Sequence, residues 1–282
     1  MVMEIFLISV TLITLFIASY TDLKTREVPD WLNYAFLFTA FGIRIIFAFQ
    51  NGLNIFLSGF FGFLAGFLLA CLFYYAGQWG GGDSKLLMGM GASIGILFPF
   101  SYSSLTLGWF FLLLLITGAV YGLGWMIIIA IRSRARFLVA FKQYFSEHQL
   151  LHHFLICLSL LIATASIAYP FLWPLAFFLP LIFYLFLFMN SIEQINFIKT
   201  IPISKLTEGD WLTKPVEING KAIISSKTIE KRDLQLLQQL SHQKKITTVI
   251  IKEGIPFIPC FLISYIFLLL SNYYLPALKY IF

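Results

Sequence analysis

The chain has 282 residues, of which 60% are hydrophobic and only 11% are charged, and its mean hydropathy is +0.88. This composition excludes an ordinary water-soluble globular protein and predicts an all-α polytopic membrane protein. The net charge of +6 would suit nucleic acid in a soluble protein. In a membrane protein, however, excess Lys and Arg report orientation, so we expect no nucleic-acid partner.

Eight apolar runs predict about eight transmembrane helices, because each is near the ~20 residues that a helix needs to cross the hydrocarbon. The fourth run is diluted by glycine, and only the Tyr169-Pro170 turn separates the sixth from the seventh. In chain order the runs cover residues 5–20, 33–49, 54–77, 84–102, 104–131, 152–169, 171–189 and 256–272. Gly62 and Gly66 in the third run, and Gly91 and Gly95 in the fourth, have the spacing that lets helix backbones approach closely.

The distribution of Lys and Arg predicts how these runs are oriented across the membrane. Alternate loops hold 17 of the 19 Lys and Arg residues, which leaves only Arg44 within a run and Lys279 near the C-terminus. By the positive-inside rule those loops are cytoplasmic and both termini lie outside. The loops concerned are residues 21–32, 78–85, 131–151 and 190–255.

We therefore divide the chain into five parts along its length. They are a catalytic membrane core of five spans (1–131), a basic amphipathic cytoplasmic loop (132–151), two additional spans (152–189), a small cytoplasmic α/β domain (190–255), and a last span with an outward C-terminus (256–282). Within the fourth part, residues 221–225 and 246–251 are predicted as strands and residues 228–242 as an amphipathic helix.

The loop that follows the fifth run combines four cations with aromatic side chains, a pattern typical of a basic amphipathic helix on anionic lipid. We therefore expect membrane lipids as partners. His148 and His152 could share one helical face, but no further ligand has the spacing of a metal site. The three cysteines stand singly inside apolar runs, which favours packing over disulfides or a metal knuckle. We expect no metal and no other cofactor.

Two acidic residues stand at the ends of apolar runs. Asp83 follows three glycines and precedes the fourth run, and Asp22 closes the first. Three consecutive glycines remove every Cβ near the acid, which allows a sharp turn and the close approach of another chain. The charge count predicts that both acids lie at the cytoplasmic face.

A pair of carboxyl groups at one face suggests hydrolysis. Two carboxyl groups that share one water, one ionised as base and the other protonated as acid, can cleave a peptide bond. We expect the N-terminus of the fourth helix to hold Asp83 ionised, which makes Asp22 the protonated partner. Both could instead be ordinary loop acids, since Glu27 and Asp30 share a loop with Asp22.

Two segments resemble the active-site segments of type IV prepilin peptidases, the G-x-G-D membrane aspartyl proteases. The first is residues 20–32, which contain Asp22, and the second is the Gly-Gly-Gly-Asp element of residues 80–83 with Lys85. The chain is most similar to the archaeal prepilin and preflagellin peptidases over residues 5–130 and again in residues 254–259. The resemblance implies that Asp22 and Asp83 are catalytic. It also implies removal of a short basic leader from pilin-like or archaellin precursors at the cytoplasmic face.

Other residues are expected to bind or shape the substrate. Glu27 and Asp30 could receive the basic leader through charge-assisted bonds, or could merely balance Lys24 and Arg26. The site-shaping candidates are Gly80, Gly81, Gly82, Lys85 and Pro256.

Other functions remain possible at this point. No tetracysteine loop is present, so we expect no methyltransferase activity. The alternatives are a transporter with a carboxylate site, or a non-catalytic scaffold of a pilus or archaellum machine. A transporter usually binds its substrate near the bilayer midplane at the junction of repeats, whereas here the acids share one face and no repeat is evident.

Overall fold

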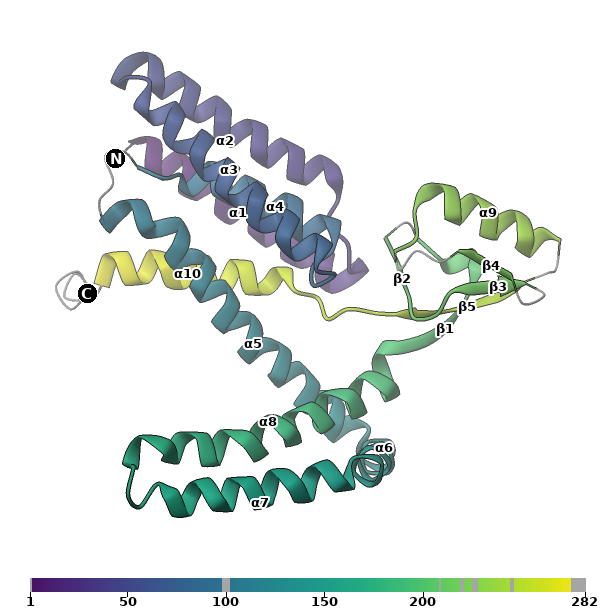
Figure 1. Cartoon of the computed structure of the whole chain (residues 1–282). Helices are drawn as coiled ribbons and strands as arrows, with labels where there is room; N and C mark the ends of the chain where they lie inside the picture. The colour runs from purple at the N-terminus through teal and green to yellow at the C-terminus, as the bar shows by residue number, and fades with distance from the viewer. Residues whose placement is uncertain are drawn as a thin grey trace. The chain divides into compact units, whose positions relative to one another are not determined.

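The computed structural model describes residues 2–97, 102–207, 209–218, 221–224, 228–243 and 246–274. The chain forms two compact units, which we describe separately. The first takes in residues 1–122 and 255–282, and the second residues 123–254. The long helix α5 (Thr106–Arg132) runs from one into the other (Figure 1).

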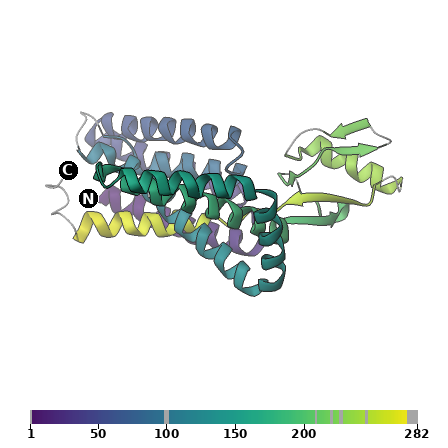
Figure 2. The ribbon, with the colours of Figure 1, turned by 60° about the horizontal axis from the view of Figure 1, so that its bottom comes forward.

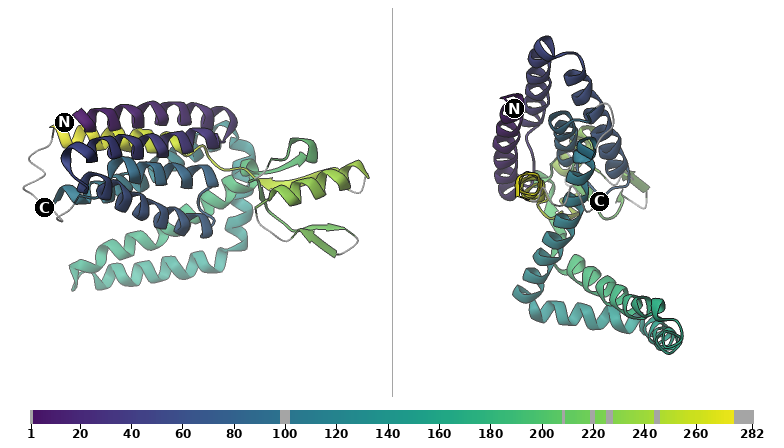
Figure 3. Two further views of the ribbon diagram at one scale, coloured as in Figure 1. Left: turned by 90° about the horizontal axis from the view of Figure 1, so that it is seen from above. Right: turned by 90° about the vertical axis from the view of Figure 1, so that its left-hand side faces the viewer.

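The first unit is a bundle of helices. α1 and α2 form a hairpin, α3 packs along α4, and α10 lies against α1 (Figure 3, left). The helices are α1 (Val2–Thr25), α2 (Asp30–Asn51), α3 (Asn54–Tyr75), α4 (Gly81–Ile94), the 3-10 turn η1 (Tyr102–Leu105), the start of α5, and α10 (Ile258–Tyr274). The last helix thus returns to the first, although more than 200 residues separate them.

The prediction of a polytopic helical membrane protein is confirmed. Five helices of the described chain are long and apolar enough to cross a membrane, or six if α6 and α7, bent by 75° at their junction, count as one span. The eight predicted runs all contain apolar helices, but the count of eight spans stays a prediction. The run predicted at 84–102 is wrong in its bounds, because α4 ends at Ile94 and Gly95 adopts a φ of 77°. At 1.5 Å per residue its 14 residues extend about 21 Å, less than the hydrocarbon thickness.

Glycines bring α3 and α4 into backbone contact, as their spacing predicted. A Cβ on Gly62 would collide with the carbonyl oxygen of Gly91, and one on Gly66 would lie 2.8 Å from the carbonyl oxygen of Leu87. Because no side chain separates the two helices, van der Waals contact between their backbones fixes the position of α4.

Arg44 fixes the far end of α4. This buried side chain on α2 donates three hydrogen bonds to carbonyl oxygens, at 2.7 Å to Ala92, 2.8 Å to Ser93 and 3.0 Å to Ile55. The last carbonyls of a helix have no partner within it, and leaving them unpaired in lipid costs several kcal/mol. The one charged residue inside an apolar run therefore satisfies the C-terminus of a helix that is too short to reach water.

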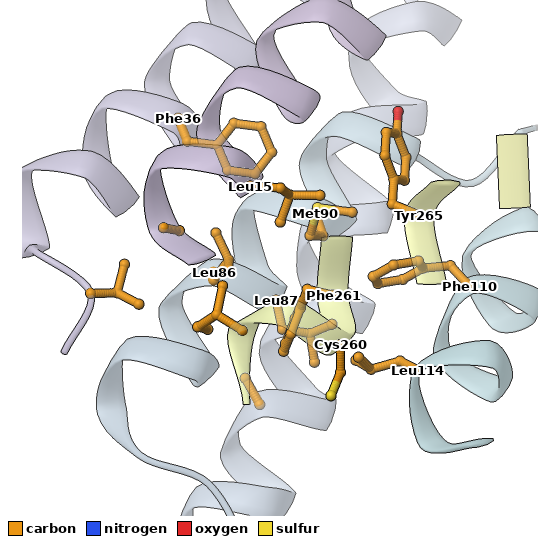
Figure 4. Packing of buried hydrophobic residues seen from close by; sticks show 14 of the residues in the cluster. Leu15, Phe36, Leu86, Leu87, Met90, Phe110, Leu114, Cys260, Phe261 and Tyr265 are labelled. Atoms are coloured by element: carbon orange, nitrogen blue, oxygen red, sulfur yellow. The ribbon is translucent and has the colours of Figure 1, made fainter. Parts of the chain in front are cut away.

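The core of the first unit joins α1, α2, α4, α5 and α10. Figure 4 shows its largest side chains interdigitated around the middle of α4. The residues labelled there are Leu15, Phe36, Leu86, Leu87, Met90, Phe110, Leu114, Cys260, Phe261 and Tyr265.

The second unit combines three helices with a small α/β part. α7 and α8 form an antiparallel hairpin, and α6 packs against α8 (Figure 1). After the end of α5 come α6 (Arg134–Glu147), α7 (Gln149–Ala165), the 3-10 turn η2 (Pro170–Leu172), α8 (Trp173–Ile192) and the π-helical turn η3 (Glu193–Phe197).

The α/β part contains an antiparallel sheet in the order β1-β5-β2, a separate β3-β4 pair, and helix α9 (Figure 2). Its elements are β1 (Ile198–Pro202), the 3-10 turn η4 (Ile203–Lys205), β2 (Trp211–Leu212), β3 (Val216–Ile218), β4 (Lys221–Ile224), α9 (Lys231–His242) and β5 (Thr248–Lys252). The three predicted elements correspond to β4, α9 and β5, but α9 begins at Lys231 instead of residue 228, β5 covers Thr248–Lys252 instead of residues 246–251, and residue 225 of the first predicted strand lies outside the described residues. Strands β1, β2 and β3 were not predicted. The domain boundaries assigned from the sequence stay predictions.

Replacing Gly62 by Ala should destabilise the protein by about 1–3 kcal/mol, because the added methyl forces α3 away from α4. Gly108→Ala in α5 is the matched control, since nothing lies within 4 Å of its Cβ position. Thermal unfolding of both variants in detergent measures the difference. Equal melting temperatures for the two variants would contradict the close backbone contact.

Candidate active site

Asp22 lies in the last turn of α1, and the start of α10 holds its carboxyl group. The side chain is only 6% exposed, and its Oδ2 accepts a hydrogen bond of 2.9 Å from the backbone N–H of Ile258. Ile258 is the first residue of α10, where backbone N–H groups are unpaired and the helix dipole is positive. Both features stabilise a carboxylate at this point.

Pro256 lies two residues before that donor and is buried. A proline before a helix fixes the backbone dihedral and lacks an N–H of its own, so it directs the chain into the first turn. The sequence prediction that Pro256 shapes the site fits this position. The hydrogen bond from Ile258 to Asp22 was not predicted, because no local pattern connects residues 236 positions apart.

Asp83 lies in the first turn of α4, within electrostatic range of Asp22. Its Oδ2 accepts a hydrogen bond of 3.3 Å from the backbone N–H of Gly80. The side chain keeps some exposed surface, but protein atoms crowd its carboxyl group. This burial, and then the nearby Asp22 carboxylate, raise the pKa of Asp83 to about 7, which the Gly80 hydrogen bond only partly offsets.

The two carboxyl groups therefore interact, and the pKa of Asp83, the acid expected to be ionised, is raised instead. We expected the N-terminus of α4 to hold Asp83 ionised. Burial and the charge of Asp22 outweigh that effect, and with a pKa of about 7 Asp83 keeps its proton in mildly acidic to neutral conditions. The backbone N–H of Ile258, at the N-terminus of α10, favours the ionised form of Asp22.

Trp79 holds the loop before Asp83 against the start of α10. Only 7% of this residue is exposed, and its ring stacks on Phe73 at a centroid distance of 4.5 Å. The same ring lies 5.7 Å from that of Phe257, which precedes the donor to Asp22. Trp79 is therefore a buried packing residue and not an exposed anchor at the membrane surface. Trp31, 65% exposed, is compatible with that role.

The three glycines before Asp83 are not needed for a left-handed turn. Gly80 has φ −76°, Gly81 and Gly82 are already helical, and in this loop the positive φ belongs to Gly77. The Cβ position of Gly81 is open, that of Gly80 lies 3.9 Å from Asp83 Oδ2, and that of Gly82 lies 3.3 Å from Val28. The glycines thus leave space beside the acid, while the sharp turn is made earlier.

The charged candidates lie close to Asp83 in sequence or in space. Lys85 Nζ lies 2.6 Å from Asp30 Oδ1, and also 5.6 Å from the ring centroid of Tyr34. Asp30 therefore already has a cation, although 62% of its side chain is exposed. Glu27 is exposed on the α1–α2 loop.

Asn33 is a polar residue that the sequence analysis missed. It is 2% exposed, and neither its amide nitrogen nor its amide oxygen has a hydrogen-bond partner within the described residues. It lies on the same face of α2 as Asp30 and Phe36. Asp30 pairs with Lys85 of α4, and the ring of Phe36 packs so closely on Gly89 of α4 that an added Cβ there would collide with it. Asn33 thus faces the first half of α4. Its place at the head of an apolar run was the only available signal.

His148 and His152, the pair considered as possible metal ligands, both lie beside aromatic rings. His152 stacks among aromatic rings, with Phe145 at 4.9 Å and Phe183 at 5.8 Å. Among the residues that the structure describes, no three His, Cys, Asp or Glu side chains gather as metal ligands would.

Comparisons with known proteins bear on the segment that carries both acids. Residues 9–127 match the model of the type IV leader peptidase family. A preflagellin peptidase from Methanococcus voltae is 34% identical over 122 residues, which cover 40% of this chain and 51% of that protein. The chain thus spans about half the length of this relative. No solved structure gives a significant match. The family resemblance read from residues 20–32 and 80–85 is confirmed.

Replacing Asp83 by Asn should stabilise the protein at pH 8 and change little at pH 4. The pKa of about 7 in the folded chain exceeds the ordinary value of 3.8, so the folded state holds a proton that the unfolded state loses. Stability therefore falls as pH rises from 3.8 towards 7, and the neutral amide removes that loss. Melting temperatures from tryptophan fluorescence in detergent measure the effect.

The control is Glu27→Gln, which removes an exposed carboxyl group from the same membrane face. Its stability should differ little from that of the wild type, because the side chain is exposed. A gain for Asp83→Asn that is the same at pH 4 and pH 8 would contradict a raised pKa.

Proposed function

We propose that this chain, whose residues 9–127 match the type IV leader peptidase family, is a membrane aspartic endopeptidase. It removes the short basic leader from pilin-like or archaellin precursors, and Asp22 and Asp83 are its catalytic acids. One observation carries the proposal: the two acids of the matched segment come from different helices, and the charge of one raises the pKa of the other. Interacting buried carboxyl groups of this kind occur at catalytic sites more often than elsewhere.

The chemistry follows from the different surroundings of the two carboxyl groups. The Asp22 carboxylate, beside the N-terminus of α10, takes a proton from a water whose oxygen attacks the scissile carbonyl carbon. Protonated Asp83 donates its proton to the carbonyl oxygen, which becomes a hydroxyl in the tetrahedral intermediate. The C–N bond then breaks, the leaving amine takes the proton held by Asp22, and the hydroxyl proton returns to Asp83. No metal enters these steps.

The open space beside Gly80 and Gly81 suits an extended peptide. Without a Cβ at these positions, the substrate backbone can lie directly over the start of α4, next to Asp83. Lys85 pairs with Asp30 and places a cation two residues after Asp83 in the sequence. We assign these residues to substrate placement and keep Asp22 and Asp83 for the chemistry.

Leader binding belongs to Glu27 in this proposal. Asp30, the second candidate, is engaged by Lys85. Glu27 is exposed on the loop that connects the helix of Asp22 to the next, so a basic leader can reach it from the water side. The distribution of Lys and Arg supports a cytoplasmic site with both termini outside.

Neither alternative is favoured. The acids lie in the last turn of α1 and the first turn of α4, whereas a transporter would place them near mid-membrane. A scaffold would not need a carboxyl group with its pKa near 7.

Asp22→Asn and Asp83→Asn should each lower cleavage of a pilin-like precursor by about 10²-fold or more, because each removes the base or the acid. The assay mixes membranes containing each variant with the precursor and follows loss of the leader on a gel. Asp210→Asn, in the α/β part, is the control and should cleave at the wild-type rate. Cleavage at the wild-type rate by either Asp22→Asn or Asp83→Asn would exclude this mechanism.

Glu27→Gln should slow cleavage of a precursor with a basic leader and leave one with a neutralised leader nearly unchanged. An exposed ion pair is worth about 0.2–1 kcal/mol, so a reduction of roughly 1.4- to fivefold in kcat/KM is expected. Asp30→Asn serves as comparison, because its carboxylate already pairs with Lys85. An equal loss on both leaders would show that Glu27 does not bind the leader.

A further inference from the structure

The helix α6 has the composition and position of a lipid-binding element. It carries Arg134, Arg136 and Lys142, follows Arg132, and exposes Leu138 and Val139 at 45% and 69%. Cations beside exposed aliphatic side chains suit the boundary between head groups and acyl chains, where both kinds of group find partners.

The neighbouring helices fix how α6 lies. α7 and α8 form an antiparallel hairpin with apolar side chains exposed on its outside, among them Leu160, Leu161 and Ile182. Such a surface needs lipid hydrocarbon around it. α6 is bent by 75° from α7, so when the hairpin stands in the bilayer, α6 lies close to the membrane plane.

One face of α6 is already occupied by protein. Ala140 is buried, and the ring of Phe137 lies 5.6 Å from that of Phe188 on α8. The remaining face, with the cations, is exposed. The helix is thus held in place by apolar contacts on one side while its charged side is available to a ligand.

A cavity of ≈ 490 Å³ lies between α6 and the π-helical turn η3. Arg136 and Gln143 line it from α6 and Gln194 lines it from η3, together with small and aliphatic residues such as Ala135, Val139 and Ile195. Its volume falls within the range of ligand pockets, it is open to solvent, and few polar side chains line it.

The charges on α6 are net positive, with three cations against the one carboxylate of Glu147. Glu193, at the start of η3, pairs with Lys252 at 2.7 Å, whereas the Glu147 carboxylate accepts a hydrogen bond from the neutral amide of Gln143 and so keeps its charge. Arg136 donates to the hydroxyl of Ser133, a neutral group, so its charge is not neutralised by that contact. The guanidinium group has further N–H donors for an anion.

We propose that this cavity binds the head group of an anionic phospholipid, with Arg136 on the phosphate and the acyl chains beside Val139 and the apolar hairpin. A guanidinium group matches phosphate oxygens bidentately, and the two glutamine side chains supply neutral donors for the rest of the head group. Arg134 and Lys142 add attraction to an anionic surface but lie outside the cavity. The proposal does not rest on the peptidase function.

The test uses the full-length protein in detergent with added phosphatidylglycerol or phosphatidylcholine of identical acyl chains, and counts retained lipids by native mass spectrometry. One phosphatidylglycerol should be retained in preference to phosphatidylcholine. Arg136→Gln should weaken that retention about fivefold, the change expected for one cation near an anionic head group. Lys231→Gln, which removes an exposed cation from α9, is the matched control and should change nothing.

Two further variants separate the cavity from general surface charge. Arg136→Lys keeps the charge but loses the planar guanidinium group, so it should retain phosphatidylglycerol with intermediate strength. This variant tests the proposal even where Arg136→Gln folds poorly. Arg134→Gln with Lys142→Gln should weaken retention less than Arg136→Gln alone. Equal retention of both lipids, or an equal loss with Lys231→Gln, would overturn the proposal. A larger loss in the double variant would replace the cavity by a diffuse basic surface.

Discussion

The contact on which the site depends is the hydrogen bond from the Ile258 N–H to the Asp22 carboxyl group. It joins the end of α1 to the beginning of α10 and so closes the bundle across 236 positions of sequence. A buried carboxyl group without a partner would be costly in this apolar setting. The N-terminus of α10 offers unpaired N–H groups that equally need a partner, so each element satisfies the other. Trp79 extends this contact to the loop that carries Asp83, because its ring packs between Phe73 and Phe257.

Helix α4, which carries Asp83, is short, and contacts with other parts of the protein fix both of its ends. Its C-terminal carbonyls accept hydrogen bonds from Arg44, and Gly62 and Gly66 set its distance from α3. A helix of about 21 Å cannot span the hydrocarbon, so its polar ends must be satisfied by protein. The N-terminal turn of this short helix carries Asp83, within electrostatic range of Asp22 at the end of α1. The position of Asp83 is therefore a consequence of how α4 is terminated.

Much of this arrangement could be predicted from the sequence, because the signals are local. Apolar runs located the helices, the charge count grouped the acids, and glycine spacing predicted the α3–α4 contact. The features that could not be predicted are those that depend on a residue far away in the sequence. The expectation that a helix N-terminus ionises Asp83 considered α4 alone, whereas the charge of Asp22 and the surrounding protein act in the opposite direction. The fourth run was predicted to continue to residue 102, because hydropathy does not reveal that Gly95 adopts a φ of 77°.

The buried polar residues of the first unit differ in how completely they are satisfied. Arg44 makes three hydrogen bonds to carbonyl oxygens, and Thr11 bonds both to Ser93 and to a carbonyl of its own helix. These residues lie toward the end of α4 that is remote from the acids, and their role there is to hold helices together. Asn33 faces the other half of α4 and has no partner within the described residues. An unpaired buried amide costs roughly 1–3 kcal/mol. The hydroxyl of Ser58, beside Gly95, is likewise unpaired within the described residues, but Asn33 leaves both a donor and an acceptor group unpaired, which favours a role toward water or substrate over a role in packing.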